Sequence, residues 1–325
     1  MAVGFGLFVI LGLVVVPVLV TLLVVVLVRR FGGDGEASWA APRAAVRARR
    51  HELLIASASA VASLVCAGVV LGLPAPGAGG NPPVPTVPGF AQAVGPFAAA
   101  VVLCVVRAVG ELTWPRPSGA VRTAPLVRRT VWSLGGARLR WLLVTALALV
   151  LALILFGLVA GEGGRQFDHP PVTWPDGSLS TSSRGPFPGW PYGVPLLGGL
   201  VVSLLVTVAT LRLVTRRSPL AGVPARHDAA VRRTSAARLL GGVQLFVGGT
   251  LGATLWIAGA AIRPGSGILG GGAEVAWLSG AGAALMVLGA AIGVVSGIAG
   301  LLAALPRHPA GAPEPRSRLA EGVQA

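Results

Sequence analysis

The chain contains no lysine, so all 26 residues of its Lys+Arg total are arginine. Lysine supplies the amine of Schiff-base and pyridoxal chemistry, the cation of the P-loop and the base of a Ser-Lys dyad. The absence of lysine therefore excludes all of these mechanisms. A GC-rich coding bias would also enrich Ala, Gly, Val, Pro and Arg, so part of the composition need not reflect function.

Charged residues are also scarce. Only 11% of the 325 residues are charged, 54% are hydrophobic, and the mean hydropathy is +0.79. Soluble domains carry about 25% charged residues, so the composition excludes one or two soluble domains and indicates a multi-span membrane protein. The net charge of +15 does not indicate a nucleic-acid partner, because the arginines lie between apolar runs. Nucleic-acid recognition needs a soluble basic face, so lipid headgroups are the expected counter-charge.

Apolar runs of about 20 residues are long enough to cross the roughly 30 Å hydrocarbon core of a bilayer as α-helices. They predict an all-α integral membrane protein with seven transmembrane helices, at residues 3–28, 53–73, 90–109, 141–160, 194–214, 239–262 and 275–305. The first run lacks a basic n-region and exceeds a typical signal-peptide h-region, so we expect a retained anchor. Residues 306–325 are expected to form a short, basic, disordered tail.

The arginines are distributed unevenly between the two sides of these spans. The segments after the first, third and fifth spans, with the C-terminal tail, hold 23 of the 26 arginines and a net charge of +16, against −1 for the other segments. Because basic residues near span ends are retained in the cytoplasm, we expect an external N-terminus and a cytoplasmic C-terminus. The third span, which Gln92, Pro96 and Arg107 interrupt, is needed for this alternation. The expected location is the plasma membrane of a prokaryote.

Three arginine-rich segments share one spacing, in which an arginine precedes an arginine pair by six and seven residues. Such clusters are candidate contacts for anionic headgroups on the cytoplasmic side, at about 1 kcal/mol for each basic residue. The same arginines would also set the topology without recognising any headgroup. A constant offset of 104 residues between the second and third segments allows, but does not require, repeated two-span units. The residues are Arg43, Arg49, Arg50, Arg122, Arg128, Arg129, Arg226, Arg232 and Arg233.

Ionisable residues inside predicted spans would be the first candidates for a functional site. Only Arg107 and Arg212 fall within spans, both near the cytoplasmic end, where a long side chain can reach the headgroups. Arg107 is expected to pair with Glu111 one helical turn later. Without a carboxylate or histidine at mid-membrane depth, the sequence argues against proton- or sodium-coupled transport.

The sequence predicts no enzyme activity, no cofactor and no metal site. The two cysteines, Cys66 and Cys104, lie in different spans and are expected to be small packing residues. A nucleophile needs a neighbouring base, and a metal site needs three or four converging ligands. The four histidines fall in loops or at span edges: His51, His169, His227 and His308.

The longest external loop, residues 161–192, is too short to fold as a domain of its own. It combines Glu162, Asp168, His169 and Asp176, which could bind a divalent cation. The alternative is a turn at Trp-Pro-Asp-Gly flanked by aromatic anchors at the membrane interface. We expect the turn and the anchors.

Glycines at four-residue spacing predict close helix packing, because they let helix backbones approach each other. We expect the sixth and seventh spans to pack within the chain, although a homo-oligomer or a membrane-protein partner could use the same face. The glycines are Gly248, Gly252, Gly289, Gly293 and Gly297.

Two functions remain open on this evidence. The first is a non-enzymatic membrane component or accessory subunit, and the alternative is a carrier or permease for an apolar or lipid-like substrate. A carrier would need polar side chains that converge on one cavity, whereas separate polar contacts would favour the first function. The candidates are Ser57, Ser59, Ser63, Gln92, Ser203, Thr207, Gln244, Thr250 and Thr254.

Overall fold

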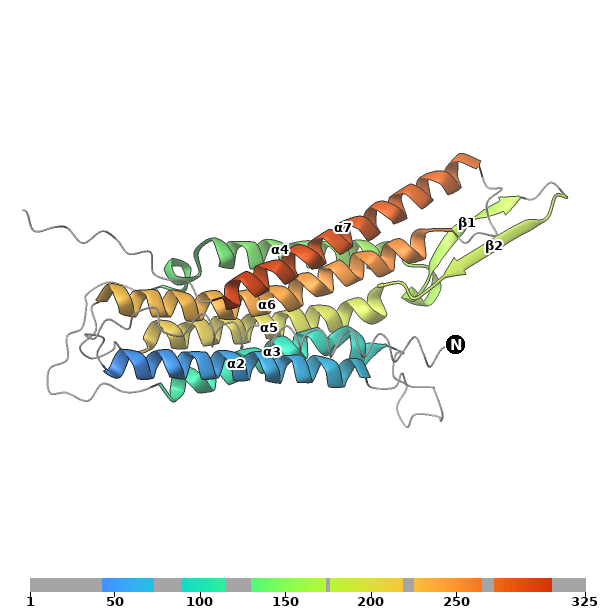
Figure 1. Ribbon diagram of the computed structural model, residues 1–325. Helices are drawn as coiled ribbons and strands as arrows, with labels where there is room; N and C mark the ends of the chain where they lie inside the picture. The colour runs from blue at the N-terminus through green and yellow to red at the C-terminus, as the bar shows by residue number, and fades with distance from the viewer. Residues whose placement is uncertain are drawn as a thin grey trace, which may run out of the picture.

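The computed structural model describes residues 43–72, 89–114, 130–173, 176–218, 225–264 and 272–305. In these residues long helices lie side by side, and successive helices run in opposite directions (Figure 1). The helices are α2 (Arg43–Gly72), α3 (Phe90–Leu112), α4 (Val131–Val159), α5 (Trp190–Arg216), α6 (Ala225–Ile262) and α7 (Gly272–Ala304). A short 3-10 turn, η1 (Glu162–Gly164), and two strands, β1 (Phe167–Thr173) and β2 (Leu179–Arg184), connect α4 to α5.

All six helices are long and apolar enough to cross a membrane. They coincide with the second to seventh predicted spans, including the interrupted third span, which forms α3. The predicted first span (3–28), the connector before Gly89 and the C-terminal tail lie outside the described residues. Three helices begin well before the predicted spans: α2 starts at Arg43, α4 at Val131 and α6 at Ala225.

Helix α6 is the centre of the bundle, since it packs against each of the other helices that the structure describes. Helix α2 packs mainly against α3, and α7 packs mainly against α6 (Figure 1). Fully buried apolar side chains from α3, α4, α5 and α6 form a continuous core, among them Phe97, Leu149, Leu153, Leu200, Leu239, Val243 and Val247.

The outer faces of the bundle are strongly apolar. Leu158 of α4 is 71% exposed and Val287 of α7 is 70% exposed, and large aliphatic side chains cover the outer faces of both helices. A water-soluble protein rarely exposes contiguous apolar area of this kind. Exposing apolar side chains to lipid hydrocarbon does not carry the free-energy cost of exposing them to water, so these faces fit a multi-pass membrane protein.

A capping box explains why α4 begins earlier than its apolar run. The Thr130 hydroxyl accepts a hydrogen bond from the Ser133 backbone N–H at 3.1 Å, and the Ser133 hydroxyl accepts one from the Thr130 N–H. The helix then bends at Gly136, whose φ of +50° lies in the left-handed region that glycine tolerates. The first turn, residues 131–135, therefore sits at an angle to the rest of α4.

The segment between α4 and α5 adds an antiparallel β-hairpin, which the all-α prediction did not include. Strands β1 and β2 pair from Phe167 opposite Arg184 to Thr173 opposite Leu179, with an irregularity between His169 and Val172. Pro170 and Pro171 occupy that irregularity, where they cannot donate to the ladder. These strands lack the alternation of apolar and polar residues that predicts a β-strand, so the sequence predicts only the turn.

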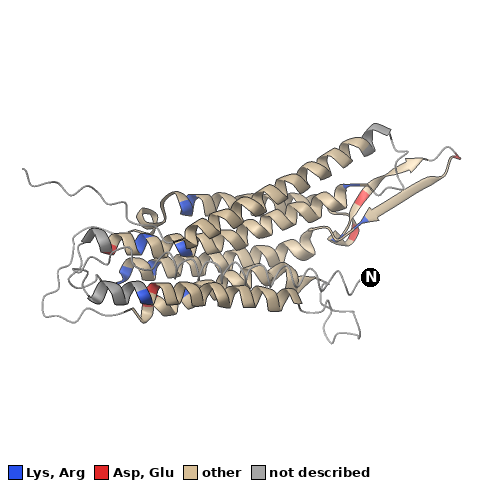
Figure 2. Ribbon diagram, in the orientation of Figure 1, with Lys and Arg blue, Asp and Glu red and all other residues tan. Residues whose placement is uncertain are grey.

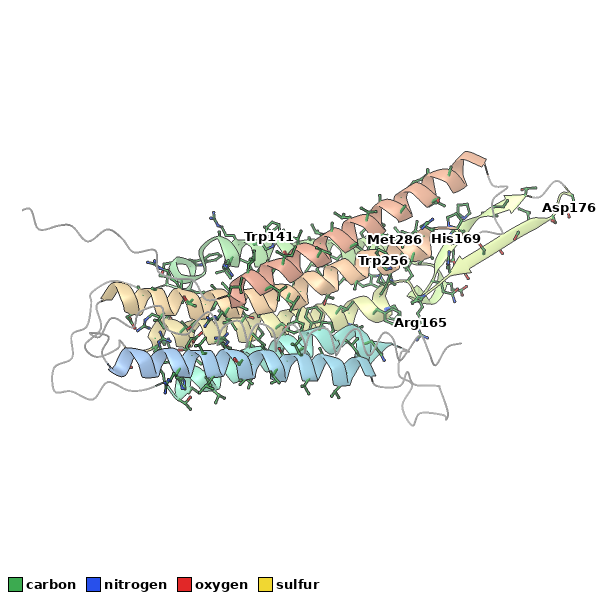
Figure 3. All side chains as sticks on the ribbon, in the orientation of Figure 1. Trp141, Arg165, His169, Asp176, Trp256 and Met286 are labelled. Carbon is green, nitrogen blue, oxygen red and sulfur yellow. The ribbon has the colours of Figure 1, made fainter. Side chains whose placement is uncertain are left out.

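The turn itself is confirmed at the tip of the hairpin. The Asp176 carboxylate accepts hydrogen bonds from the Ser178 N–H at 2.9 Å and from its hydroxyl at 2.6 Å, and Gly177 follows with φ +80°. These bonds hold the pKa of Asp176 below its usual value. The tip therefore carries a charge at neutral pH, at the end of the molecule farthest from α2's first residues (Figure 3).

Glycine backbones bring α6 and α7 into direct contact. A Cβ at Gly252 would lie 2.6 Å from the carbonyl oxygen of Gly289, and a Cβ at Gly248 would collide with the Ser296 hydroxyl. A Cβ at Gly293 or Gly297 would meet nothing within 4 Å. Four of the five predicted glycines therefore lie where the two helices touch, since a Cβ at Gly252 would also lie 3.1 Å from the Gly293 backbone nitrogen.

Replacing Gly252 with leucine should separate α6 from α7, because the nearest atoms are backbone and cannot move aside. We expect a loss of about 1–3 kcal/mol in the free energy of unfolding. Gly249→Leu is the matched control, since a Cβ at Gly249 meets nothing within 4 Å. Thermal unfolding of both variants in the same lipid discs makes the comparison, and equal midpoints would contradict the assigned contact.

Candidate functional site: a buried arginine network

Charged side chains of the helix bundle gather at one end, opposite the β-hairpin (Figure 2). Seven of them are buried there and come from α2, α3, α6 and the residue that follows α5. They are Glu52, Arg107, Glu111, Arg217, Asp228, Arg232 and Arg238.

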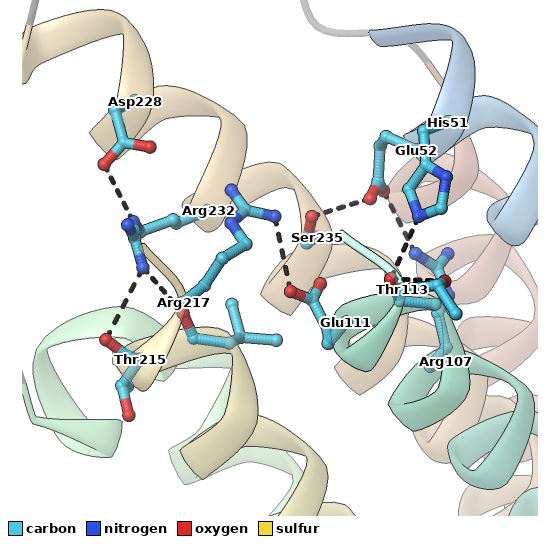
Figure 4. A network of polar contacts seen from close by, with 12 residues as sticks. His51, Glu52, Arg107, Glu111, Thr113, Thr215, Arg217, Asp228, Arg232 and Ser235 are labelled. Atoms are coloured by element: carbon cyan, nitrogen blue, oxygen red, sulfur yellow. Dashed lines mark hydrogen bonds and ion pairs between the residues drawn. The ribbon is translucent and has the colours of Figure 1, made fainter. Parts of the chain in front are cut away.

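The Glu52 carboxylate joins three helices. Its Oε1 accepts hydrogen bonds from Arg107 of α3 at 3.0 Å and from Arg238 of α6 at 3.1 Å. Its Oε2 accepts one from the Ser235 hydroxyl of α6 at 2.8 Å. Both carboxylate oxygens are therefore used, and α2, α3 and α6 are tied together at one point (Figure 4).

The prediction that Arg107 pairs with Glu111 and reaches the headgroups is wrong. Arg107 is 7% exposed and pairs with Glu52, and its Nε also donates to the Ser59 hydroxyl at 3.1 Å. Spacing within α3 cannot reveal a partner on another helix. The one available signal was the position of Glu52 near the end of a predicted span. Arg212, the other arginine expected inside a span, is exposed.

Arg217 follows α5 and carries the second ion pair. One of its N–H groups donates to Glu111 Oε2 at 3.4 Å, and its guanidinium lies over the Trp114 ring, 3.7 Å from the centroid. The His51 ring meets the same tryptophan edge-on, with 5.4 Å between centroids, and bonds the Gly110 carbonyl. Burial lowers the pKa of Arg217 and the neighbouring Glu111 opposes that shift.

Arg232 closes the C-terminal end of α5. Its Nε donates to Asp228 at 2.9 Å, and its Nη1 donates to the carbonyl oxygens of Val214 at 2.9 Å and Thr215 at 3.5 Å (Figure 4). Carbonyls in the last turn of a helix lack partners within the helix, and a cation there also suits the helix dipole. The cap therefore fixes α5 against α6.

The predicted headgroup arginines divide into three groups. Arg50 and Arg233 are exposed, whereas Arg232 is 2% exposed and bonded inside the protein. Arg43, Arg49 and Arg226 lie on helices, but their side chains lie outside the described part. The whole second segment, with Arg122, Arg128 and Arg129, lies outside the described residues.

A second polar layer lies deeper, where α4, α6 and α7 meet. The Gln244 amide nitrogen donates to the Thr145 hydroxyl at 3.0 Å and reaches the Ser296 hydroxyl at 3.5 Å. Such interhelical bonds contribute about 0.6 kcal/mol each in a membrane. They link the central helix to two neighbours.

A third polar layer lies between α3 and α5. The Ser203 hydroxyl donates to the Phe97 carbonyl at 3.4 Å, Cys104 Sγ contacts the Thr207 hydroxyl at 3.5 Å, and Thr210 donates to the Cys104 carbonyl at 3.3 Å. Cys104 is thus a buried packing residue, and both cysteines are free. Ser203, Thr207 and Gln244, three of the side chains proposed for a cavity, therefore face separate helix interfaces.

His169 and Asp176 of the segment between α4 and α5 lie apart. Figure 3 places His169 at the base of the hairpin and Asp176 at its tip, and His169 Nε2 donates to the Ile262 carbonyl at 3.1 Å. Asp168 accepts instead from the Glu162 backbone N–H at 3.3 Å. Within the described ranges, no three His, Cys, Asp or Glu side chains are grouped to hold a metal ion.

Glu52→Gln should weaken the bundle strongly, because it removes the carboxylate charge that the buried Arg107 and Arg238 share. We expect a loss of about 3–5 kcal/mol in the free energy of unfolding. Glu162→Gln removes the same charge from an exposed position at the opposite end and should change stability by less than about 0.5 kcal/mol. Thermal denaturation in lipid discs compares the two, and similar midpoints for both would refute the role of Glu52.

Comparison of the chain with protein-family models, with curated proteins and with solved structures gives no significant match. The functional argument therefore depends on the geometry of the chain's own residues.

Proposed function

We propose that the protein is a non-enzymatic membrane component, such as an accessory subunit of a membrane complex. The observation that carries this proposal is that polar side chains in the bundle form hydrogen bonds between neighbouring helices. The Glu52 centre, the Gln244 layer and the Ser203–Thr210 layer each bond neighbouring helices to one another. Their donors and acceptors stabilise the bundle, and they do not surround a common substrate.

A carrier for an apolar or lipid-like substrate is the alternative, and the same observation weighs against it. A carrier needs polar groups that face a cavity from several helices and become accessible from both sides in turn. Ser203 lies in the layer between α3 and α5, whereas Gln244 lies where α4, α6 and α7 meet. Ser59 is already bonded to Arg107 in the network.

Helix α7 offers the best surface for a membrane partner. It packs mainly against α6, which leaves most of its circumference exposed. Val287 and Val294 are 70% and 62% exposed, and the neighbouring Gly293 leaves open space where a Cβ would be. Small residues beside exposed aliphatic side chains permit close approach of another transmembrane helix.

Photo-crosslinking residues at Val287 and Val294 should capture one membrane protein, which should also co-purify stoichiometrically in native-membrane discs. Matched positions on α4, Leu151 and Leu158, are equally exposed and should crosslink to lipid alone. Mass spectrometry identifies the products. If no protein is captured and vesicles with the pure chain move lipid between leaflets, the carrier is the correct function.

We further propose that the end with the arginine network faces the cytoplasm of a prokaryotic cell. Its support is the excess of arginine in the segments at that end, because basic residues near span ends are retained inside. The β-hairpin would then face outward from the plasma membrane.

A membrane-impermeant maleimide should label Thr181→Cys on the hairpin in intact cells, because this exposed residue would face outward. Arg216→Cys, exposed at the opposite end, should react only after the cells are opened. Both variants carry alanine at positions 66 and 104. The reverse labelling pattern would overturn the proposed orientation.

A further inference from the structure

Several buried hydrogen-bond donors near the end of α5 have no acceptor in the part of the chain that the structure describes. They are Nε and Nη2 of Arg217, Nη2 of Arg232 and Nε1 of Trp114. The Arg217 side chain is only 1% exposed and that of Arg232 only 2%. A buried donor without a partner costs about 1–3 kcal/mol, and more when it is charged.

These donors lie close together. The Arg217 guanidinium stacks on the Trp114 ring, and both Arg217 and the head of Arg232 lie at the last turn of α5. Arg232 is bonded there to the Val214 carbonyl, three residues before Arg217. Figure 4 shows Arg217 and Arg232 near each other, and the Trp114 ring lies under the Arg217 guanidinium, so N–H groups without an acceptor from three side chains lie in one region.

The charge of the network also lacks one negative partner. Its four buried arginines face three buried carboxylates, Glu52, Glu111 and Asp228. Both oxygens of Glu52 are bonded elsewhere, and Glu111 reaches Arg217 through one N–H. An anion with several acceptor oxygens would supply acceptors for these donors and balance the charge of the described network.

We propose that Arg217, Arg232 and Trp114 bind a phosphate group. Guanidinium forks match phosphate oxygens geometrically, and an indole N–H adds a further donor. The position fits as well, because the ends of the membrane-spanning helices lie at the depth of lipid headgroups. The phosphate can belong to an anionic lipid or to a soluble ion, since both offer the same oxygens. This proposal does not depend on a protein partner.

A built site differs from general attraction to arginine, and the chain offers matched controls. Arg216 is exposed beside the buried Arg217, and Arg233 is exposed beside the buried Arg232. If phosphate were held only by surface attraction, substituting either arginine of a pair would weaken binding equally, and binding would fall steeply as salt is added. Binding at the buried donors should depend on Arg217 and Arg232 alone and should persist at high salt.

The test uses the full chain in discs of phosphatidylcholine, with or without phosphatidylglycerol. Native mass spectrometry counts retained phosphatidylglycerol, and thermal unfolding in phosphatidylcholine discs is followed with inorganic phosphate against chloride of equal ionic strength. We expect Arg217→Gln and Arg232→Gln to weaken binding about tenfold. Arg216→Gln and Arg233→Gln should bind like the unchanged chain.

Retention of phosphatidylglycerol identifies a lipid phosphate as the ligand, and stabilisation by inorganic phosphate alone identifies a soluble one. Absence of both effects in the unchanged chain, or equal losses within each pair, would overturn the proposal. Trp114→Phe serves if Arg217→Gln does not fold, since it keeps the ring under the guanidinium and removes one donor. It should weaken binding about threefold, and unchanged binding would contradict the site.

Discussion

A charge buried among helices must find its partner inside the protein, and the Glu52 carboxylate shows how this chain meets that requirement. Removing an ion from water costs several kcal/mol, so an unpaired carboxylate or guanidinium would separate the helices. Glu52 accepts from Arg107, Arg238 and Ser235, which makes one side chain of α2 the meeting point of α3 and α6. The position of α2, which otherwise packs mainly against α3, depends on this contact.

The two ends of the bundle are held by different means. At the arginine-rich end, ion pairs and the Arg232 cap fix the helix ends in place. At the other end the β-hairpin rests on α6, where His169 and Arg184 donate to the carbonyls of Ile262 and Arg263. Between them, apolar side chains and the close approach of Gly252 to Gly289 hold the helices together. Side chains on loops and helix ends thus supply partners for the last turns of α5 and α6.

Apolar runs predicted the helices well, because a helix that crosses a bilayer needs about 20 apolar residues and a run of that length is visible in the sequence. The same approach missed the hairpin, whose strands carry exposed polar residues and two prolines in place of an apolar alternation. It placed Arg107 against Glu111, since neighbours on one helix are visible in sequence, whereas Glu52 lies 55 residues away. It did not show that Arg232 is buried, because burial of an arginine depends on how α5 ends beside α6. Partners on separate helices become visible only when the helices are packed.

The proposed function depends on polar side chains that, in the described residues, bond helix to helix. An electron cryo-microscopy structure of the full chain in lipid discs containing phosphatidylglycerol tests it most directly. The account predicts Glu52 between Arg107 and Arg238, and Gln244 bonded to Thr145, in separate closed layers. A continuous water-filled cavity lined by Gln244 together with Ser203 would contradict it and favour a carrier.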